Sequence, residues 1–282
     1  PSNPIAAFAD GNMLQVLVFA LIIGFTLIAV GEKGTPFLNL IDSINEVCLK
    51  IITTIMYFTP IGVFCTIVPV VEANGTETII SLATQLVILY VAFFGFAIVV
   101  YGFSVKLIGK QSPLKFLKAI LPAALNAFGT CSSSATIPLS KQCMEEEMGV
   151  SNQITSIAIP LGATVNMDGT SIMQGVAVIF VAQIFGITLS PSDLVTVIIT
   201  ATLASIGTSG VPSVGLITLA MVFQSVGVPT EGIALIMGID RILDMLRTAV
   251  NITGDAVCTT IVANQEGLVN KETFNSDVTV DN

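Results

Sequence analysis

Residues 240–255 of the chain read DRILDMLRTAVNITGD, a stretch in which charged and amide side chains recur at helical spacing. They follow one another at steps of four, three, four and four: Asp240, Asp244, Arg247, Asn251 and Asp255. Because successive residues of an α-helix are about 100° apart, these side chains fall within an arc of about 80°. The other faces and both flanks are mostly apolar. The stretch therefore predicts a largely hydrophobic helix with one polar stripe.

The surroundings of the stripe decide how it is interpreted. In a soluble protein, such a pattern is usually a solvated face with weak ion pairs. Here 53% of the 282 residues are hydrophobic and only 10% are charged, against roughly 25% in average soluble domains. The apolar runs are long and do not alternate, which is typical of a helical membrane protein. Charges within a bilayer usually face a protein-lined pathway, so we interpret the stripe as functional.

Composition also argues against several other classes. The absence of His removes the usual proton shuttle and metal ligand. Five cysteines without metal-type spacing and ten Lys and Arg without a basic run give no sign of a transition metal or of a nucleic-acid partner. Four lysines at 106, 110, 115 and 118 place their connection in the cytoplasm. We expect a multi-pass protein of the plasma or inner cell membrane and, since the chain starts with Pro1, a fragment or processed product.

Apolar runs long enough to span a bilayer cover residues 13–30, 46–71 and 79–108, with a polar break at 31–42. Three later runs are each interrupted: by FGTCSSSAT at 128–136, NMDGT at 166–170 and SIGTSGVP at 205–212. Backbone freed by such breaks finds no partner in lipid, so it is tolerated where it lines a site. A broken hairpin followed by a polar helix, occurring twice, predicts an inverted-repeat transporter.

The NMDGT break has the chemistry of a cation site. Asn166 and Asp168 are two residues apart and cannot share a face of a regular helix, but an unwound helix lets them surround an ion. Asn251 and Asp255, one turn apart, can add further oxygens. Oxygen ligands suit a hard ion such as Na⁺. Alternatively, Asp168 caps the second helical segment, which is compatible with the first interpretation.

Two further groups have a functional and a structural interpretation. Asp244 and Arg247 suit a zwitterion with an additional carboxylate, the acid for the ammonium and the guanidinium for the carboxylate; alternatively, they form an internal pair that only neutralises itself. The run Ser132–Ser134 offers hydroxyls and free N–H groups to a ligand, or is a plain loop or a set of serines bonded within a helix.

Together these stretches resemble the dicarboxylate/amino acid:cation symporters, the glutamate transporter family. The resemblance covers nearly the whole chain and rests on GTCSSS at 129–134, PLGATVNMDGT at 160–170, SIGTSGVP at 205–212 and D-x-x-x-D-x-x-R-T-x-x-N-x-x-G-D at 240–255. It implies an all-α membrane protein with transmembrane helices and two re-entrant helical hairpins in an inverted repeat, working as a homotrimer of elevators. It also implies partial scaffold and trimerisation helices at 1–76, without the first three helices of the family, a transport domain at 77–267 and a tail at 268–282.

The resemblance assigns residues to substrate and to sodium. The implied substrate-binding residues are Cys131 through its backbone, Ser133, Thr170, Gly210, Val211, Gly215, Asp244, Arg247, Thr248 and Asn251, with the second hairpin tip acting as a gate. The implied sodium sites comprise Gly162, Asn166, Asn251 and Asp255 in the first, Thr164 with backbone at Ser205, Ile206 and Thr208 in the second, and Asn166 with Asp168 in the third. The sequence departs from the family at Cys131 and Met245, where members commonly place an extra arginine; Arg241 is the nearby candidate to replace it.

We therefore expect a secondary transporter, not an enzyme, that couples Na⁺ to symport of acidic amino acids, aspartate or glutamate. Its partners would be the amino acid, sodium ions, membrane lipid and copies of itself. The alternative is a C4-dicarboxylate symporter, with proton coupling as an option. A remote alternative is an intramembrane aspartyl protease that uses Asp168 and Asp244 as its two acids.

Overall fold

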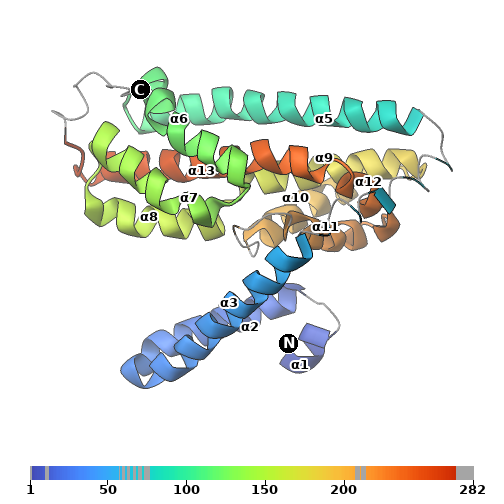
Figure 1. The fold of residues 1–282 in the computed structure, drawn as a ribbon, viewed down its shortest axis with the longest axis horizontal. Coiled ribbons are helices and arrows are strands. Elements are labelled where there is room, and N and C mark those ends of the chain that lie inside the picture. Colours follow the sequence, from blue (N-terminus) through green and yellow to red (C-terminus); the bar gives the residue numbers. More distant parts are fainter. Residues whose placement is uncertain are drawn as a thin grey trace. The chain divides into compact units, whose positions relative to one another are not determined.

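The computed structural model describes residues 2–9, 13–56, 77–206 and 214–270, together with seven separate positions at 58, 61, 64, 65, 68, 72 and 210. Within this part of the chain the regular elements are all helical, and one isolated bridge joins Val150 and Val269 (Figure 1). The chain divides into two compact units, Pro1–Pro69 and Val70–Asn282. The sequence-based prediction of a helical, apolar protein is therefore confirmed.

The first unit consists of α1 (Pro4–Ala9), α2 (Met13–Val30), the short turn η1 (Gly31–Gly34) and α3 (Thr35–Met56). Helix α2 matches the predicted span. Helix α3 begins at Thr35, within the stretch expected to be a polar break, because Gly31 (φ +67°) alone interrupts the chain and Pro36 is well placed in a first helical turn. Most of the predicted span beyond residue 56 lies outside the described residues.

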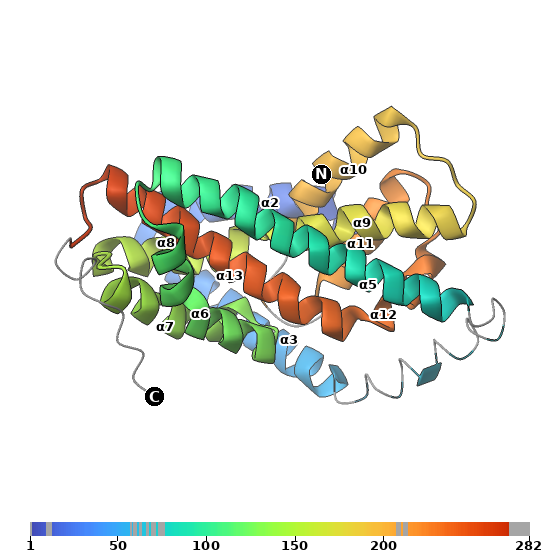
Figure 2. The same ribbon diagram turned by 90° about the horizontal axis from the view of Figure 1, so that it is seen from above.

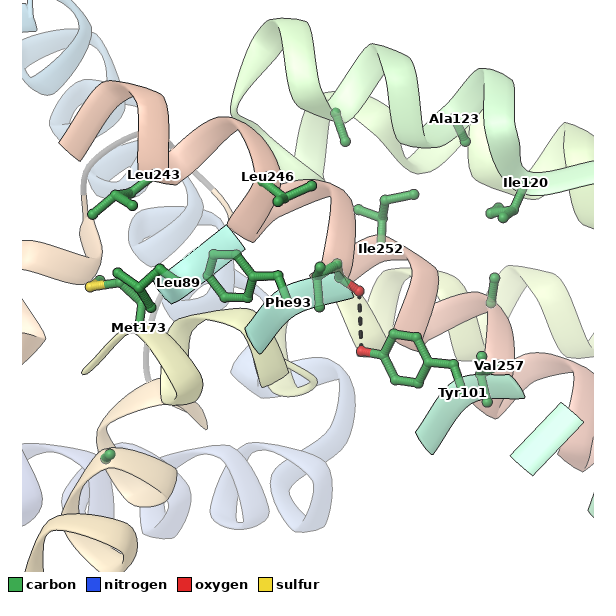
Figure 3. Packing of buried hydrophobic residues seen from close by; sticks show 14 of the residues in the cluster. Leu89, Phe93, Tyr101, Ile120, Ala123, Met173, Leu243, Leu246, Ile252 and Val257 are labelled. Carbon is green, nitrogen blue, oxygen red and sulfur yellow. Dashed lines mark hydrogen bonds between the residues drawn. The ribbon is translucent and has the colours of Figure 1, made fainter. Parts of the chain in front are cut away.

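The second unit opens with a long apolar helix. Helix α5 (Glu77–Phe96) continues through two π-helical turns, η2 (Ala97–Tyr101) and η3 (Ser104–Ile108). One side of it is outward-facing and apolar, with Val91 66% and Ile98 68% exposed, while Phe93 and Tyr101 are buried (Figure 3). This division fits a helix with lipid on one face and protein on the other.

Three helix pairs follow, and each is interrupted where the sequence predicted. Helices α6 (Pro113–Thr130) and α7 (Ser133–Gln142) form the first pair, and the turn η4 (Cys143–Glu147) extends it. The second pair is α8 (Asn152–Val165) and α9 (Asp168–Ile184), and the third is α10 (Pro191–Ile206) and α11 (Val214–Ser225). At the start of α10, the hydroxyl and N–H of Ser190 both donate to Asp193 and hold the pKa of that carboxyl below its ordinary value.

The stretch with the polar stripe forms the centre of this unit. After η5 (Thr230–Gly232) and α12 (Ile233–Met237), helix α13 (Asp240–Gln265) packs against α6, α8 and α9 and also contacts α5 and α7. Figure 2 shows α13 running between α5 and the α6–α7 pair. Its residues are buried almost without interruption from Leu243 to Val257, so the polar stripe faces protein.

Three stretches of the described residues are long and apolar enough to cross a membrane, judged by length and composition: Val18–Cys48, Ile80–Ile108 and Asn152–Ile184. The third contains the NMDGT break, and half of its most apolar window is buried inside the protein. An interrupted apolar helix with a buried polar centre is what the backbone requires when it lines a site within lipid.

Candidate functional site

The first break meets the third at a single carbonyl. Helix α6 ends at Cys131, which has a left-handed conformation (φ +53°) and donates its N–H to Ala127 O at 2.8 Å. The next residue, Ser132, caps α7: its Oγ accepts from the N–H of Ala135 at 3.2 Å. The same hydroxyl donates to Gly210 O at 2.8 Å, and the N–H of Ser134 donates to that oxygen at 3.3 Å. The serine run is therefore a helix cap that also joins two breaks.

The break between α8 and α9 exposes polar groups to α13. Asn166 and Met167 leave the helical conformation (φ −91°, ψ 83° and φ −111°, ψ 53°). The Asn166 amide donates to Asp255 Oδ1 at 3.0 Å and to Asn251 O at 3.5 Å. The N–H of Gly169 donates to Asn251 Oδ1 at 2.7 Å. The first predicted sodium set thus converges around the stripe of α13.

Gly162 completes that set by its closeness to Asp255. A Cβ added at Gly162 would lie 2.6 Å from Asp255 Oδ1, so the backbone of α8 directly faces this carboxylate. Asp255 itself is only 2% exposed. Backbone of α8 and the Asn166 amide therefore lie against a buried carboxylate, and within the described residues no basic side chain pairs with it.

Asp168 is oriented by a residue that the sequence did not single out. The hydrogen-bond pattern makes Met167 the cap residue of α9, without a side-chain bond, so the expectation that Asp168 caps this helix is not met. Asp168 is instead the first residue of α9, and its Oδ2 accepts the hydroxyl proton of Tyr101 at 2.8 Å. Tyr101 lies 67 positions earlier, and no local pattern connects the two.

The charged residues predicted to bind substrate precede the sodium residues along α13, and Arg247 lies about one helical turn before Asn251. Arg247 Nη2 contacts Asp244 Oδ1 at 2.7 Å, and Nη1 is 3.9 Å from Asp240 Oδ1. Thr248 Oγ1 donates to Asp244 Oδ1 at 2.8 Å. The internal acid–base pair is therefore formed. Arg247 Nη1, however, is buried and makes no hydrogen bond within the described residues.

The second hairpin covers that guanidinium. A Cβ added at Gly215, in the first turn of α11, would collide with Arg247 Nη1 and would lie 3.0 Å from Cζ. Gln174 of α9, which sequence reasoning missed, donates to Thr218 Oγ1 at 2.7 Å and so joins α9 to α11. Its position one turn after Thr170 in an apolar helix was the available signal. Arg247 thus faces the α11 end of the hairpin expected to act as a gate.

Thr170 and Asn251 connect the two sets of residues. The Asn251 amide donates to Thr170 Oγ1 at 3.4 Å, and its nitrogen lies 3.2 Å from Met167 Sδ. Thr170 is 1% exposed and Ser133, from the first hairpin tip, 2%. Both predicted substrate residues are therefore buried, and Thr170 contacts the polar stripe of α13 through Asn251.

The second predicted sodium set is less complete in the structure. Thr164 is exposed and donates to Leu161 O of its own helix at 2.9 Å. Ser205 accepts the hydroxyl proton of Ser171 at 2.7 Å, which joins α10 to α9, and Ile206 is the exposed last residue of α10. Val211 and Thr208 lie outside the described residues. No hydrogen bond joins Thr164 to Ser205 within the part of the chain that the structure describes.

The ligand types present select among ions. Within the described residues, no group of three or more His, Cys, Asp and Glu is arranged to hold a metal ion. The first and third predicted sites instead combine one carboxylate each with amide or carbonyl oxygens, and the second consists of hydroxyl and carbonyl oxygens alone. Such sets suit a monovalent hard cation better than a transition metal.

Comparison with known proteins places these observations in a family. The model of the sodium:dicarboxylate symporter family matches residues 1–265. An excitatory amino acid transporter of Caenorhabditis elegans is 38% identical over 253 residues, which are 89% of this chain and 50% of that protein. Human excitatory amino acid transporter 1 is 37% identical over 282 residues, 99% of this chain and 52% of that protein. Mouse excitatory amino acid transporter 3 is 36% identical over 276 residues, 97% and 52% of the two chains.

The chain spans about half the length of these curated relatives. The family and the relatives are named as symporters and transporters, not as enzymes. The family match covers most of the chain and includes all three helix interruptions and the polar stripe of α13. This membrane protein belongs to the sodium:dicarboxylate symporter family.

Proposed function

We propose that this chain carries the substrate and cation sites of a Na⁺-coupled symporter for acidic amino acids, aspartate or glutamate. The observation that carries the proposal is the environment of Arg247. Arg247 is 3% exposed and its guanidinium pairs with Asp244. Nη1 lies beside Gly215 of α11 and makes no hydrogen bond to any residue that the structure describes. A buried donor that makes no hydrogen bond costs roughly 1–3 kcal/mol, which a bound carboxylate would offset.

The neighbouring acid defines the rest of the substrate. Asp244 accepts from Arg247 and Thr248. An amino acid with a side-chain carboxylate replaces part of this pair: its carboxylate takes the guanidinium, and its ammonium takes Asp244. A C4-dicarboxylate offers no ammonium, so Asp244 would repel it. This charge arrangement favours aspartate or glutamate over succinate.

Sodium coupling rests on shared residues. Asn251 belongs to the first sodium set, in which its carbonyl accepts from the Asn166 amide, and its own amide donates to Thr170 of the substrate set. A cation that orders Asn166, Asn251 and Asp255 therefore also orders Thr170. In thermodynamic terms, each ligand then raises the affinity for the other by the same factor.

Transport requires that the site opens to each side of the membrane in turn. We infer that α6–α7 and α10–α11 are re-entrant hairpins of an inverted repeat and that the second tip opens when Gly210 leaves Ser132 and Ser134. In this proposal, residues 77–267 form the moving transport domain of an elevator, 1–76 form scaffold and trimerisation helices, and 268–282 form a tail. The protein would work as a multi-pass homotrimer in the plasma or inner cell membrane.

Uptake into vesicles tests the proposal. The protein is reconstituted, and labelled aspartate and labelled succinate are each offered with an inward gradient of Na⁺ or of choline. We expect aspartate to accumulate in the Na⁺ arm only, and succinate to compete weakly. Preference for succinate, with accumulation driven by a proton gradient, would replace this function by dicarboxylate–proton symport. Equal aspartate uptake in Na⁺ and choline would refute sodium coupling.

A further inference from the structure

We propose that Tyr101 is a positioning residue of the cation site at Asp168, an inference that rests on the proposed sodium coupling. Tyr101 comes from η2, the π-helical continuation of α5, outside every stretch that the sequence linked to substrate or ion. Its hydroxyl donates to Asp168 Oδ2 at 2.8 Å and lies 3.2 Å from Val250 O of α13. Figure 3 shows the ring extending from α5 towards α13 and its bond to the α13 backbone.

The backbone of α5 changes its winding just before this residue. Tyr101 is the last residue of the π-helical turn η2, and single π-turns inside α-helices often occur at functional positions. The ring is held by an edge-on contact with Phe96, whose centroid is 5.0 Å away at an interplanar angle of 76°. Only 4% of Tyr101 is exposed. The hydroxyl is therefore fixed in direction before any ion binds.

Gly254 shows how closely the polar groups converge. A Cβ added at Gly254 would lie 2.5 Å from Asn166 Nδ2, 2.6 Å from Tyr101 OH and 2.9 Å from Asp168 Oδ2. The tyrosine hydroxyl, the Asn166 amide and the Asp168 carboxylate thus surround one point on α13. Two of these three groups are the predicted third sodium set, and Tyr101 adds a hydroxyl to it.

The Tyr101 hydroxyl has one proton and two possible acceptors, Asp168 Oδ2 and Val250 O, and the role of Tyr101 depends on which of them it bonds. A carboxylate is the stronger acceptor, and the shorter of the two contacts leads to Asp168, so Tyr101 donates its hydrogen bond mainly to Oδ2. This bond occupies one carboxylate oxygen, fixes the plane of the carboxyl group and leaves the other oxygen for a cation. Groups that orient a metal-binding side chain typically contribute about 10- to 100-fold to metal affinity.

The chain offers a matched control on the same helix. Tyr90 of α5 also donates its hydroxyl to the α13 backbone, to Ile242 O at 2.9 Å, but among the described residues it makes no hydrogen bond to a predicted sodium residue. Tyr101→Phe and Tyr90→Phe therefore each remove one hydroxyl that joins α5 to α13. Only the first removes a hydrogen bond to a carboxylate of the cation site.

The experiment titrates NaCl against the purified protein, without amino acid, with choline chloride keeping ionic strength constant. Thermal stability reports binding, because an ion that binds only the folded state raises the Tm with its concentration. We expect Tyr101→Phe to raise the half-saturating Na⁺ concentration by at least about tenfold and Tyr90→Phe to leave it unchanged. The two variants should have similar Tm values in choline alone.

The double variant tests the route of the effect. In an Asp168→Asn background, Tyr101→Phe should change the Na⁺ response little further, because the carboxylate that it orients is gone. Equal Na⁺ responses of Tyr101→Phe and Tyr90→Phe would overturn the inference. So would a Tm in choline that falls far more for Tyr101→Phe with an unchanged Na⁺ response, since this indicates a structural role. If the unsubstituted protein shows no Na⁺ response, the proposed function fails together with this inference.

Discussion

Asn166 and Asp255 are 89 positions apart in the chain, yet the amide of the first donates to Oδ1 of the second at 3.0 Å. The bond crosses from the break between α8 and α9 to the polar stripe of α13. Within the part of the chain that the structure describes, the buried carboxylate accepts from this neutral amide and pairs with no basic side chain. A buried acid of this kind is costly without a nearby positive charge, so the relationship itself favours a cation at this location.

The closeness of Gly162 to Asp255 gives the first prediction. In Gly162→Ala, the new methyl group would lie 2.6 Å from Oδ1, so the carboxylate must move. We expect the half-saturating Na⁺ concentration to rise by about tenfold or more, the usual effect of disturbing a ligand's orientation, measured as the Na⁺ dependence of aspartate binding.

Gly175→Ala is the matched control for this substitution. Gly175 lies in α9, and an added Cβ would meet nothing within 4 Å. That variant should bind Na⁺ normally and gain up to about 1 kcal/mol in stability, because alanine restricts the unfolded chain. An unchanged Na⁺ dependence in Gly162→Ala would show that Asp255 does not contact the ion.

The second prediction concerns the contact between Gly215 and Arg247. In Gly215→Ala, the added methyl group would collide with the guanidinium and displace either the arginine or the start of α11. Such overpacking costs about 1–3 kcal/mol, or roughly 5- to 150-fold in aspartate affinity if the cost falls on the bound state. Equilibrium binding of labelled aspartate at saturating Na⁺ measures it.

The control for Gly215→Ala is Gly129→Ala, near the end of α6, where an added Cβ meets nothing within 4 Å. Na⁺ binding without aspartate should be nearly normal in both variants, because Gly215 contacts the substrate side of α13. A Gly215→Ala protein with normal aspartate affinity would mean that Arg247 does not hold the substrate carboxylate in this conformation.

The sequence predicted the helix interruptions well because their residues disfavour helix locally. Gly and Ser at 129–134, Asn166 before Met167 and the Gly, Ser and Pro residues at 205–212 all weaken regular backbone bonding. The stripe of α13 was predictable for the same reason, since it depends on the helical period alone. These features position the candidate site within the chain.

The partners of the polar groups could not be predicted in the same way. Nothing near Tyr101 or Asp168 in the sequence indicates that they bond to each other, because the contact depends on how α5 packs against α13. The start of α3 at Thr35 was missed because residues 31–42 read as a polar break, although an exposed helix face accommodates the polar residues after Thr35. Periodicity describes one element, and the site is made by contacts between elements.

The third prediction addresses the contact of the two hairpins. Ser132→Ala removes the hydroxyl that caps α7 and donates to Gly210 O. We expect the loss of the cap to cost about 0.5–2 kcal/mol in stability, and we expect faster release of bound aspartate because the covering hairpin loses one bond. The release rate is measured by diluting the protein loaded with labelled aspartate into Na⁺ buffer with excess unlabelled aspartate and following the loss of bound label.

Thr202→Ala provides the comparison for Ser132→Ala. Its hydroxyl donates to Ile198 O within α10, so its removal leaves the contact between hairpins intact. The release rate should be unchanged in that variant. If Ser132→Ala released aspartate at the unsubstituted rate despite a lower Tm, the bond to Gly210 would have no part in holding the substrate.

The last prediction separates the charge of Arg247 from its shape. Removing the charge altogether would leave Asp240 and Asp244 buried beside each other, so Arg247→Ala confounds binding with folding. Arg247→Lys keeps the charge near Asp244 but loses the planar fork that offers Nη1 to a carboxylate. Because a point charge replaces paired donors, we expect aspartate affinity to fall by roughly 10- to 100-fold while the Na⁺-dependent rise in Tm without aspartate is kept.

The control is Arg241→Lys, because Arg241 is an exposed arginine on the same helix. This variant should bind aspartate normally. If instead Arg247→Lys bound aspartate normally and lost its Na⁺ response, the guanidinium would serve the cation set, and the substrate carboxylate would have to be held elsewhere.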